Sequence, residues 1–186
     1  MQVHLIKNEL LRSCTYILYD STEYVFLIDC GDSDKVLKWI KTNNKIIKGI
    51  FLTHCHYDHI YGLGNVLREN PFVILFASKA TIMGLKDENK NLSYIIKEEN
   101  IIFNEEFRER QINEGCYTFD TLQIEVLHTP GHSDDCLSYI IEDYIFTGDS
   151  FIPHTKVFAN WPTSNKLLAI EQEQRLVNSK RPKMTY

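Results

Sequence analysis

Residues 53–59 read THCHYDH and directly follow the apolar run IIKGIFL at residues 46–52. The histidines His54, His56 and His59 and the carboxylate of Asp58 therefore lie within six positions. Imidazole nitrogens and carboxylate oxygens are the ligands that suit zinc, and they also suit iron and manganese. His54 and His56 can face one point only while the chain between them stays extended. The segment therefore predicts a metal site on a loop at the end of a strand.

A second group of histidines lies at residues 128–132, HTPGH, after a run of alternating apolar residues. Pro130 and Gly131 turn the chain sharply, and such a turn can aim His132 back into a site. His128 still follows the alternation of the strand, so we expect it to be a hydrogen-bonded residue beside the site rather than a ligand. The motif therefore adds His132 to the candidate ligands.

A third strand-like run ends at residues 144–150, YIFTGDS, where Asp149 follows an apolar segment and a glycine. Taken alone, an aspartate at this position would usually belong to a turn. Because the strands of one sheet bring their ends to one edge, the three strand ends are best explained together as parts of one site. Hairpins interrupted by helices, with ligand-type residues at strand ends, are consistent with two packed sheets and helices outside them.

The motifs HCHYDH, HTPGH and FTGDS resemble the HxHxDH, PGH and GD motifs of the metallo-β-lactamase fold superfamily. Residues 27–32, LIDCGD, resemble the IDPGD turn near the start of such proteins, so the resemblance covers nearly the whole chain. It implies an α/β (α+β) fold, the four-layer αββα sandwich of the metallo-β-lactamase type, as one domain over residues 1–186, with the site at one edge of the β core. The HxHxDH motif is specific, whereas the other two are weak alone.

The resemblance also implies a set of ligands. They are His54, His56 and His132 at a first metal, Asp58 and His59 at a second, and Asp149 between the two. Asp58 is also expected to orient the nucleophile, which makes it the candidate catalytic residue. Cys55 is expected to point away from the site as a buried thiol. Asp149 resembles the aspartate of glyoxalase II and its relatives, whereas the best-known β-lactamases carry cysteine there, so penicillin-type substrates are not expected.

The implied activity is hydrolysis that depends on Zn²⁺, with one or two ions per chain. A bound divalent metal lowers the pKa of water from about 15.7 to near 7 and polarises a carbonyl group. The leading hypothesis is therefore a zinc-dependent hydrolase in which metal-bound hydroxide attacks a small thioester, lactone or ester. Asp29, at the end of a strand, is expected to support the site rather than to react.

One departure from the family pattern concerns the second metal. Family members supply a further histidine from a loop near the C-terminus, whereas this sequence ends at residues 181–186, RPKMTY, without one. We therefore expect a fold shortened at its C-terminus, with residues 182–186 loosely held. His154 could replace the missing ligand if the loop after Asp149 folds inward, although a surface position is the simpler expectation.

The missing histidine leaves two other hypotheses open. One is a mononuclear Fe²⁺ oxygenase of the persulfide dioxygenase kind, which in this superfamily uses three ligands, here His54, His132 and Asp149. The other is an impaired or non-catalytic metal-binding protein. Oxygen consumption with a glutathione persulfide separates the dioxygenase from the hydrolase, because a hydrolase consumes no oxygen.

Composition narrows the class of protein. The 186 residues suggest one domain, and an apolar fraction of 44% is enough for a core. A net charge of -5 without a basic stripe disfavours nucleic acid as a partner. Five widely spaced cysteines without a CxxC pair favour reduced thiols. Because neither a secretion signal nor an apolar run of about 20 residues is seen, we expect a cytoplasmic protein without a membrane partner. The oligomeric state stays open.

The other elements are predicted from spacing and turn residues. The expected strands cover residues 15–19, 23–29, 46–52, 72–77, 122–127, 137–141 and 144–147. The expected helices follow caps at Ser33 and Ser78, run from about 59 to 69 and over 165–178, and occupy part of 91–111.

Overall fold

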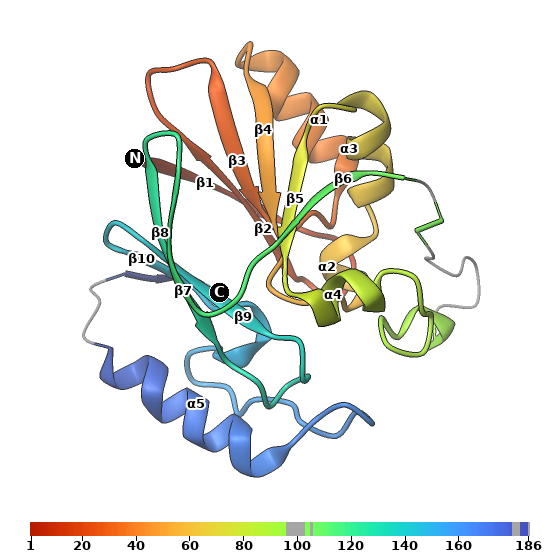
Figure 1. Ribbon diagram of the computed structural model, residues 1–186, viewed down its shortest axis with the longest axis vertical. Coiled ribbons are helices and arrows are strands. Elements are labelled where there is room, and N and C mark those ends of the chain that lie inside the picture. Colours follow the sequence, from red (N-terminus) through yellow and green to blue (C-terminus); the bar gives the residue numbers. More distant parts are fainter. Residues whose placement is uncertain (96–102, 105, 180–182, 186) are drawn as a thin grey trace.

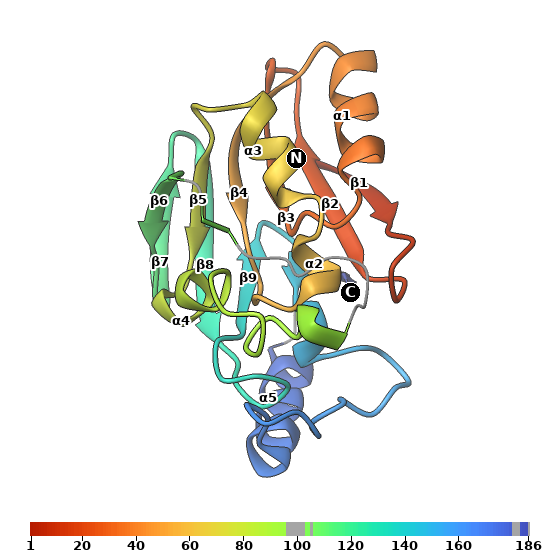
Figure 2. The same cartoon turned by 90° about the vertical axis from the view of Figure 1, so that its right-hand side faces the viewer.

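The computed structural model describes residues 1–95, 103–104, 106–179 and 183–185. Within these residues, two β-sheets pack face to face and helices lie outside them (Figures 1 and 2). The strand order is β1-β2-β3-β4-β5-β6 in one sheet and β11-β10-β9-β8-β7 in the other. This is the four-layer sandwich that the resemblance implies. Among the described residues, no helix is both long and apolar enough to cross a membrane.

The larger sheet brings several strand ends to one edge. Its strands are β1 (Gln2–Lys7), β2 (Cys14–Tyr19), β3 (Tyr24–Ile28), β4 (Ile46–Phe51), β5 (Ile74–Ala77) and β6 (Arg108–Gln111). The pairs β1–β2 and β2–β3 are antiparallel, whereas β3, β4, β5 and β6 run parallel to one another. The C-terminal ends of β3, β4 and β5 therefore share an edge, and Asp29, Thr53 and Ser78 lie just beyond them.

The smaller sheet delivers two further strand ends. Its strands are β7 (Gly115–Phe119), β8 (Leu122–His128), β9 (Leu137–Ile141), β10 (Tyr144–Phe146) and β11 (Lys183–Thr185). Both β8 and β10 pair antiparallel with β9, so they run in the same direction and end on the same side. His132 follows the end of β8, and Asp149 follows the end of β10.

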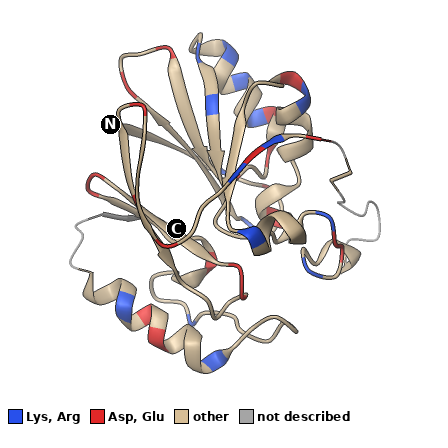
Figure 3. Cartoon of the chain, viewed as in Figure 1, with Lys and Arg blue, Asp and Glu red and all other residues tan. Residues whose placement is uncertain are grey.

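Helices cover the outer faces of both sheets. They are α1 (Ser33–Thr42), α2 (Tyr57–Ile60), α3 (Leu63–Glu69), α4 (Lys79–Gly84) and α5 (Lys166–Asn178), with short 3₁₀ turns η1 (Ser93–Ile95) and η2 (Gly148–Ser150). Val36 of α1 and Val66 of α3 pack on the larger sheet, and Leu176 of α5 packs against Leu127 and Ile145 of the smaller one. Charged residues of both signs occur along α5 (Figure 3), as expected for a helix with one face in solvent.

An aromatic cluster fills the space between the sheets. The ring of Phe51 lies 4.7 Å from Phe76, 5.4 Å from Phe119 and 5.5 Å from Tyr139, measured between ring centroids. All four side chains are buried, and each burial contributes roughly 1.5–3 kcal/mol. The hydroxyl group of Tyr139 donates a hydrogen bond to the carbonyl of Leu52. This contact ties the start of the THCHYDH segment to the smaller sheet.

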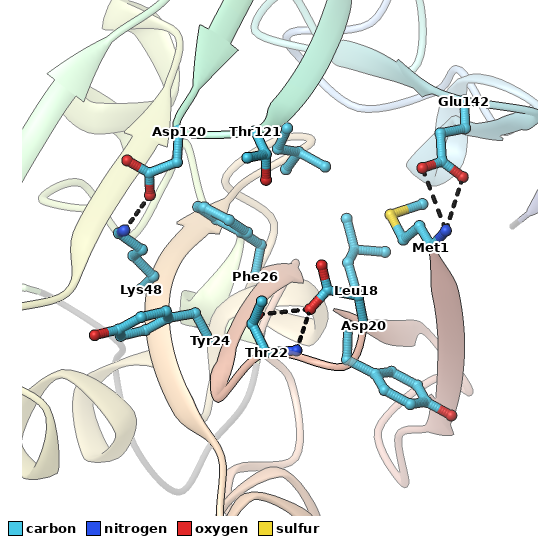
Figure 4. A pocket seen from close by; sticks show the side chains of 12 residues that line it. Met1, Leu18, Asp20, Thr22, Tyr24, Phe26, Lys48, Asp120, Thr121 and Glu142 are labelled. Atoms are coloured by element: carbon cyan, nitrogen blue, oxygen red, sulfur yellow. Dashed lines mark hydrogen bonds and ion pairs between the residues drawn. The ribbon is translucent and has the colours of Figure 1, made fainter.

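At the opposite edge, two ion pairs join the sheets around a small hollow (Figure 4). Lys48 of β4 pairs with Asp120 in the β7–β8 turn. The amino group of Met1 lies 3.0 Å from a carboxylate oxygen of Glu142 in the β9–β10 turn. The two sheets are therefore linked at the edge away from the strand ends that carry the histidine and aspartate motifs.

Most elements predicted from the sequence are present, with shifted boundaries. The hairpin of β2 and β3 is confirmed, and Ser78 caps α4 by accepting a hydrogen bond from the backbone of Thr81. The cap of α1 is Asp32 rather than Ser33. The helix expected over about 59–69 is divided between α2 and α3. Strands β1, β6, β7 and β11 were not predicted.

Two expectations concern segments that are described only in part. Of residues 91–111, η1 and β6 are described, while residues 96–102 and 105 lie outside the described ranges. The expectation of loosely held residues over 182–186 is wrong for Lys183–Thr185, because they pair in parallel with β10. Residues 182 and 186 lie outside the described part of the chain.

Candidate metal centre

Three histidine side chains from two loops meet at the shared edge of the sheets. One ring nitrogen from each of His54, His56 and His132 lies within 4.8 Å of the other two. Nδ1 of His56 is 2.8 Å from Nε2 of His132. The exposed fractions of these side chains are at most 3%. The residues that the sequence predicts as ligands of a first metal thus form one buried cluster.

A second group overlaps the first. Ligand atoms of His54, His59 and Asp149 also lie within 4.8 Å of one another. The two carboxylate oxygens of Asp149 face different histidines: Oδ1 is 3.3 Å from Nε2 of His59, and Oδ2 is 3.3 Å from Nε2 of His132. Asp149 thus lies between the two groups, where the sequence predicts it.

Asp58 lies beside the second group. One of its carboxylate oxygens is 3.6 Å from Nε2 of His59, and the residue is 7% exposed. Burial raises the pKa of the Asp58 carboxyl group above its usual value. The structure therefore brings all six predicted ligand residues to one edge, with Asp58 set back from both histidine groups.

Asp29 fixes the orientation of two of these histidines. Its Oδ2 atom accepts hydrogen bonds from Nδ1 of His59, at 2.8 Å, and from the hydroxyl group of Thr53, at 2.7 Å. Because that hydroxyl group donates to Asp29, it accepts the hydrogen bond from Nδ1 of His54, at 3.0 Å. Both rings therefore carry their proton on Nδ1 and turn Nε2 toward the site. Asp29 supports the site, as we expected from the sequence.

His132 is oriented by the loop before α5. Its Nδ1 atom donates a hydrogen bond to the carbonyl of Phe158 at 2.7 Å, which turns Nε2 toward His56 and Asp149. The carbonyl of His132 accepts a hydrogen bond from Ser164, and the carbonyl of Gly131 accepts one from the backbone of Asn165. Asn165 is also the N-cap of α5. The start of α5 thus holds the turn that carries His132.

Two glycines allow the loops to approach closely. Gly131 has φ +146°, and a Cβ atom there would lie 2.4 Å from the backbone nitrogen of Ala169 in α5. Gly148 has φ +49°, and a Cβ atom there would lie 2.5 Å from Oγ1 of Thr53. Glycine is the residue that fits both the positive φ and the short contact. These positions explain the glycines of the PGH and GD motifs in physical terms.

The neighbouring charges shift the titration of the cluster. Burial, together with the imidazoles nearby, holds the pKa values of His54 and His56 well below their usual value. Burial would also lower the pKa of His59, but the carboxylates around it outweigh burial and raise its pKa well above the usual value. Burial would raise the pKa of Asp149, but its hydrogen bond and charge interactions with His59 lower it.

Some residues weighed from the sequence lie outside both groups. His128 is exposed, and its Nε2 atom lies 3.2 Å from the carbonyl of Asp134, which fits the expected hydrogen-bonded role. His154 is exposed and belongs to neither group, so it does not replace the missing ligand among the described residues. Cys55 is 3% exposed and directs its thiol to the carbonyl of Lys90, away from the histidines, as expected.

Asp135 supports the loop of residues 53–59, which we call the metal loop, but its role was not predicted from the sequence. It is 2% exposed, and its Oδ2 atom accepts hydrogen bonds from the backbone of Cys55, at 2.9 Å, and from the hydroxyl group of Thr81, at 3.0 Å. Its Oδ1 atom accepts one from Ser133. It thus fixes the backbone between His54 and His56. The only signal in the sequence is its position three residues after His132.

The sequence model of the metallo-beta-lactamase superfamily matches residues 10–182 of the chain. Hydroxyacylglutathione hydrolase from Buchnera aphidicola subsp. Schizaphis graminum is 30% identical over 135 residues, which cover 73% of this chain and 46% of that protein. The chain spans about half the length of the curated relatives it matches, 46% to 51% for three hydroxyacylglutathione hydrolases.

Solved structures share the fold. The BLEG-1 B3 metallo-beta-lactamase superposes with a TM-score of 0.84 at 23% identity, covering 97% of this chain and 87% of that one. TTHA1623 in a di-iron-bound form superposes with a TM-score of 0.83 at 20% identity, covering 98% of this chain and 90% of that one. At these identities the likeness concerns the fold alone.

Proposed function

Because the chain belongs to the metallo-beta-lactamase superfamily, a superfamily of metallo-hydrolases, we propose that it is a zinc-dependent hydrolase of small thioesters, lactones or esters. The observation that carries the proposal is a buried nitrogen atom, Nε2 of His54. It has no hydrogen-bond partner among the described residues, while Nδ1 of the same ring is already hydrogen-bonded. A buried acceptor without a partner is costly, and a metal ion would satisfy it.

The residues fit two adjoining metal positions. Nε2 of His54, Nδ1 of His56 and Nε2 of His132 would hold the first ion, and three protein ligands are typical of a catalytic zinc site with an open position. His59 and Asp58 would hold the second ion, with Asp149 between the two. The second position has fewer described ligands, so we expect it to bind its ion more weakly.

A divalent metal in this site would supply a water molecule of lowered pKa and would polarise the substrate carbonyl. The chain's own residues do the positioning. Asp149 keeps the two histidine groups at a fixed separation through its two oxygens. Asp58 offers a carboxylate oxygen that accepts a hydrogen bond from the attacking water and so orients it. Asp29 and the carbonyl of Phe158 keep the protons of three imidazoles away from the site.

The relatives support hydrolysis without identifying the substrate. The name of the relative from Buchnera describes hydrolysis of a hydroxyacylglutathione, but this chain matches only 46% of that protein. We therefore do not assign a glutathione thioester. The proposed substrate class is limited to small acyl compounds with a carbonyl group open to attack.

The test combines metal content with turnover. Protein purified without added metal or chelator should contain about one or two zinc ions per chain by elemental mass spectrometry, and it should hydrolyse at least one member of a panel of thioesters, lactones and esters. His54→Ala should lose both properties. His128→Ala is the matched control, because that histidine is exposed and outside both groups. Absence of both zinc and turnover in the unmodified protein would overturn the proposal.

A mononuclear iron dioxygenase is the second candidate function. The contact that favours it is the distance of 3.3 Å between Nε2 of His132 and Oδ2 of Asp149, because this reaction class in the superfamily needs only these two residues and His54. The fold is also shared by a protein solved in a di-iron-bound form. About one iron per chain, with oxygen consumption on a glutathione persulfide, would replace the hydrolase proposal. A hydrolase consumes no oxygen with that substrate.

A further inference from the structure

The turn between β1 and β2 has a conformation that its residues do not favour. Ser13 donates a backbone hydrogen bond to the carbonyl of Leu10 at 3.3 Å, and the two central residues, Leu11 and Arg12, have φ +48° and +59°. A β-turn with positive φ at both central positions strongly prefers Asn, Asp or Gly there. Leucine and arginine are strained in that region of backbone space. The strain must therefore be held by the surroundings.

A hydrogen bond joins the base of the turn to the metal loop. The hydroxyl group of Ser13 donates a hydrogen bond to the carbonyl of Asp58 at 2.6 Å. The backbone of Asn8 donates to the carbonyl of Ser13 at 2.9 Å, and the side-chain amide of Asn8 donates to the hydroxyl group of Ser13 at 3.0 Å. Ser13 and Asn8 are buried. These contacts fix the position of Arg12 relative to Asp58.

The strained residues line a pocket that opens onto the candidate metal centre. This cavity of about 260 Å³ has Leu11 and Arg12 in one wall and Asp58, His59 and Asp149 in another. Among the described residues that line it, Arg12 is the one lysine or arginine. Arg12 is exposed, and within the described part of the chain no ion pair or side-chain hydrogen bond involves its guanidinium group. Arg12 thus lines this pocket as an exposed cation that no described carboxylate neutralises.

We propose that Arg12 binds a carboxylate group of the substrate, so that the hydrolase takes small acyl compounds that carry a free carboxylate away from the reacting carbonyl. This inference rests on the proposed function and deepens it. Strained backbone is found where the surroundings and the function maintain it. The planar guanidinium group matches a carboxylate with two parallel hydrogen bonds, which a small pocket can present in one orientation. Arg12 therefore determines specificity and takes no part in the bond that breaks.

The test uses two thioesters of equal length, one ending in a carboxylate and the other in the primary amide of that carboxylate. The unmodified protein should prefer the carboxylate substrate. Arg12→Gln should raise KM for it by roughly 10-fold, the lower range for a hydrogen bond to a charged group at an exposed position, and should leave the neutral substrate unchanged. Arg12→Lys should restore part of the preference. Arg108→Gln in β6 changes the net charge equally outside the pocket and should change neither KM.

A second variant separates recognition from folding. Arg12→Gly relieves the positive φ, so it should raise the melting temperature by about 2 to 4 °C while it abolishes the preference for the carboxylate substrate. A purely structural role for Arg12 predicts no loss of preference. Stability and selectivity that move in opposite directions would support the proposal.

The outcomes distinguish the inference from the proposed function. Equal KM values for both substrates in the unmodified protein and in Arg12→Gln, with turnover intact, would overturn the carboxylate site and leave the hydrolase standing. Absence of turnover would overturn the hydrolase, and glutarate binding measured by calorimetry would then decide the site. Weaker glutarate binding by Arg12→Gln than by Arg108→Gln supports the site, and equal binding overturns it.

Discussion

Nδ1 of His59 lies 2.8 Å from Oδ2 of Asp29. That same oxygen accepts a hydrogen bond from the hydroxyl group of Thr53, and the hydroxyl oxygen accepts one from Nδ1 of His54. One buried carboxylate thus sets the direction of a histidine from each of the two ligand groups. Asp29 itself has φ +57°, a region that aspartate tolerates better than most residues. Its role in the site is therefore orientation, exerted through hydrogen bonds at some distance from any reacting atom.

Asp29→Asn should weaken metal binding without removing a ligand. The amide cannot accept the same hydrogen bonds at both oxygen positions, so His54 and His59 lose their fixed orientation. Loss of such a supporting contact typically costs about 10- to 100-fold in metal affinity. Zinc affinity measured by competition with a chromophoric chelator checks this. Asp34→Asn, an exposed aspartate on α1, is the control. Equal affinities in the two variants would contradict the orienting role of Asp29.

Metal removal should lower the thermal stability of the protein. An ion that binds only the folded state stabilises it by about 4 kcal/mol when its free concentration is 1,000 times Kd. Melting curves recorded with and without a chelator such as EDTA measure the effect. His54→Ala should show a much smaller difference between the two conditions, because it lacks a ligand of the first ion and only the weaker second position remains. An unchanged melt of the unmodified protein would show that the site holds no ion under those conditions.

Gly131→Ala should be more harmful than Gly115→Ala, although both glycines have large positive φ values, +146° and +152°. At Gly131 the new Cβ atom would lie 2.4 Å from the backbone of Ala169, whereas at Gly115 the nearest atom is 3.8 Å away. Backbone strain alone costs about 1–3 kcal/mol, and Gly131→Ala adds the clash. Urea unfolding measures both variants. Equal losses of stability would show that strain, rather than contact with α5, explains the glycine.

Thiol reactivity should follow burial. Cys116 is exposed, while burial raises the pKa of Cys55, and burial with the nearby Asp135 raises that of Cys136 to about 12. At pH 8 these two thiols stay protonated in the folded protein, and only a thiolate reacts quickly. Mass spectrometry after brief treatment with N-ethylmaleimide should find the label at Cys116. Labelling of Cys55 and Cys136 should require urea. Early labelling of Cys55 in the native protein would contradict its position in the core.

The sequence predicted the residues of the candidate site better than it predicted the residues that hold them in place. The candidate ligand residues stand in short motifs at strand ends, where local spacing, turn chemistry and the family resemblance predicted that they meet. Asp135 and the carbonyl of Phe158 act through contacts with partners far along the chain, which no local pattern reveals. Whether the ligands bind metal stays a prediction.

The missed strands have a similar explanation. Strand β6 is exposed at all four positions, RERQ, so it lacks the apolar alternation on which a strand prediction depends. It is a strand because it pairs with β5. Strand β11 likewise exists through its pairing with β10. By contrast, α5 was predicted over nearly its full length, because Asn165 caps it locally.

The tight turn at Leu11 and Arg12 has a consequence for how such a protein diversifies. The ligand residues follow strands in the middle of the sheets, where most substitutions would disturb packing. The tip of the β1–β2 hairpin belongs to the edge of its sheet, and its two central side chains contact the pocket without supporting a metal ligand directly. Substitutions at these two neighbouring positions could therefore change which substrate is bound, while the residues of the candidate metal centre stay the same.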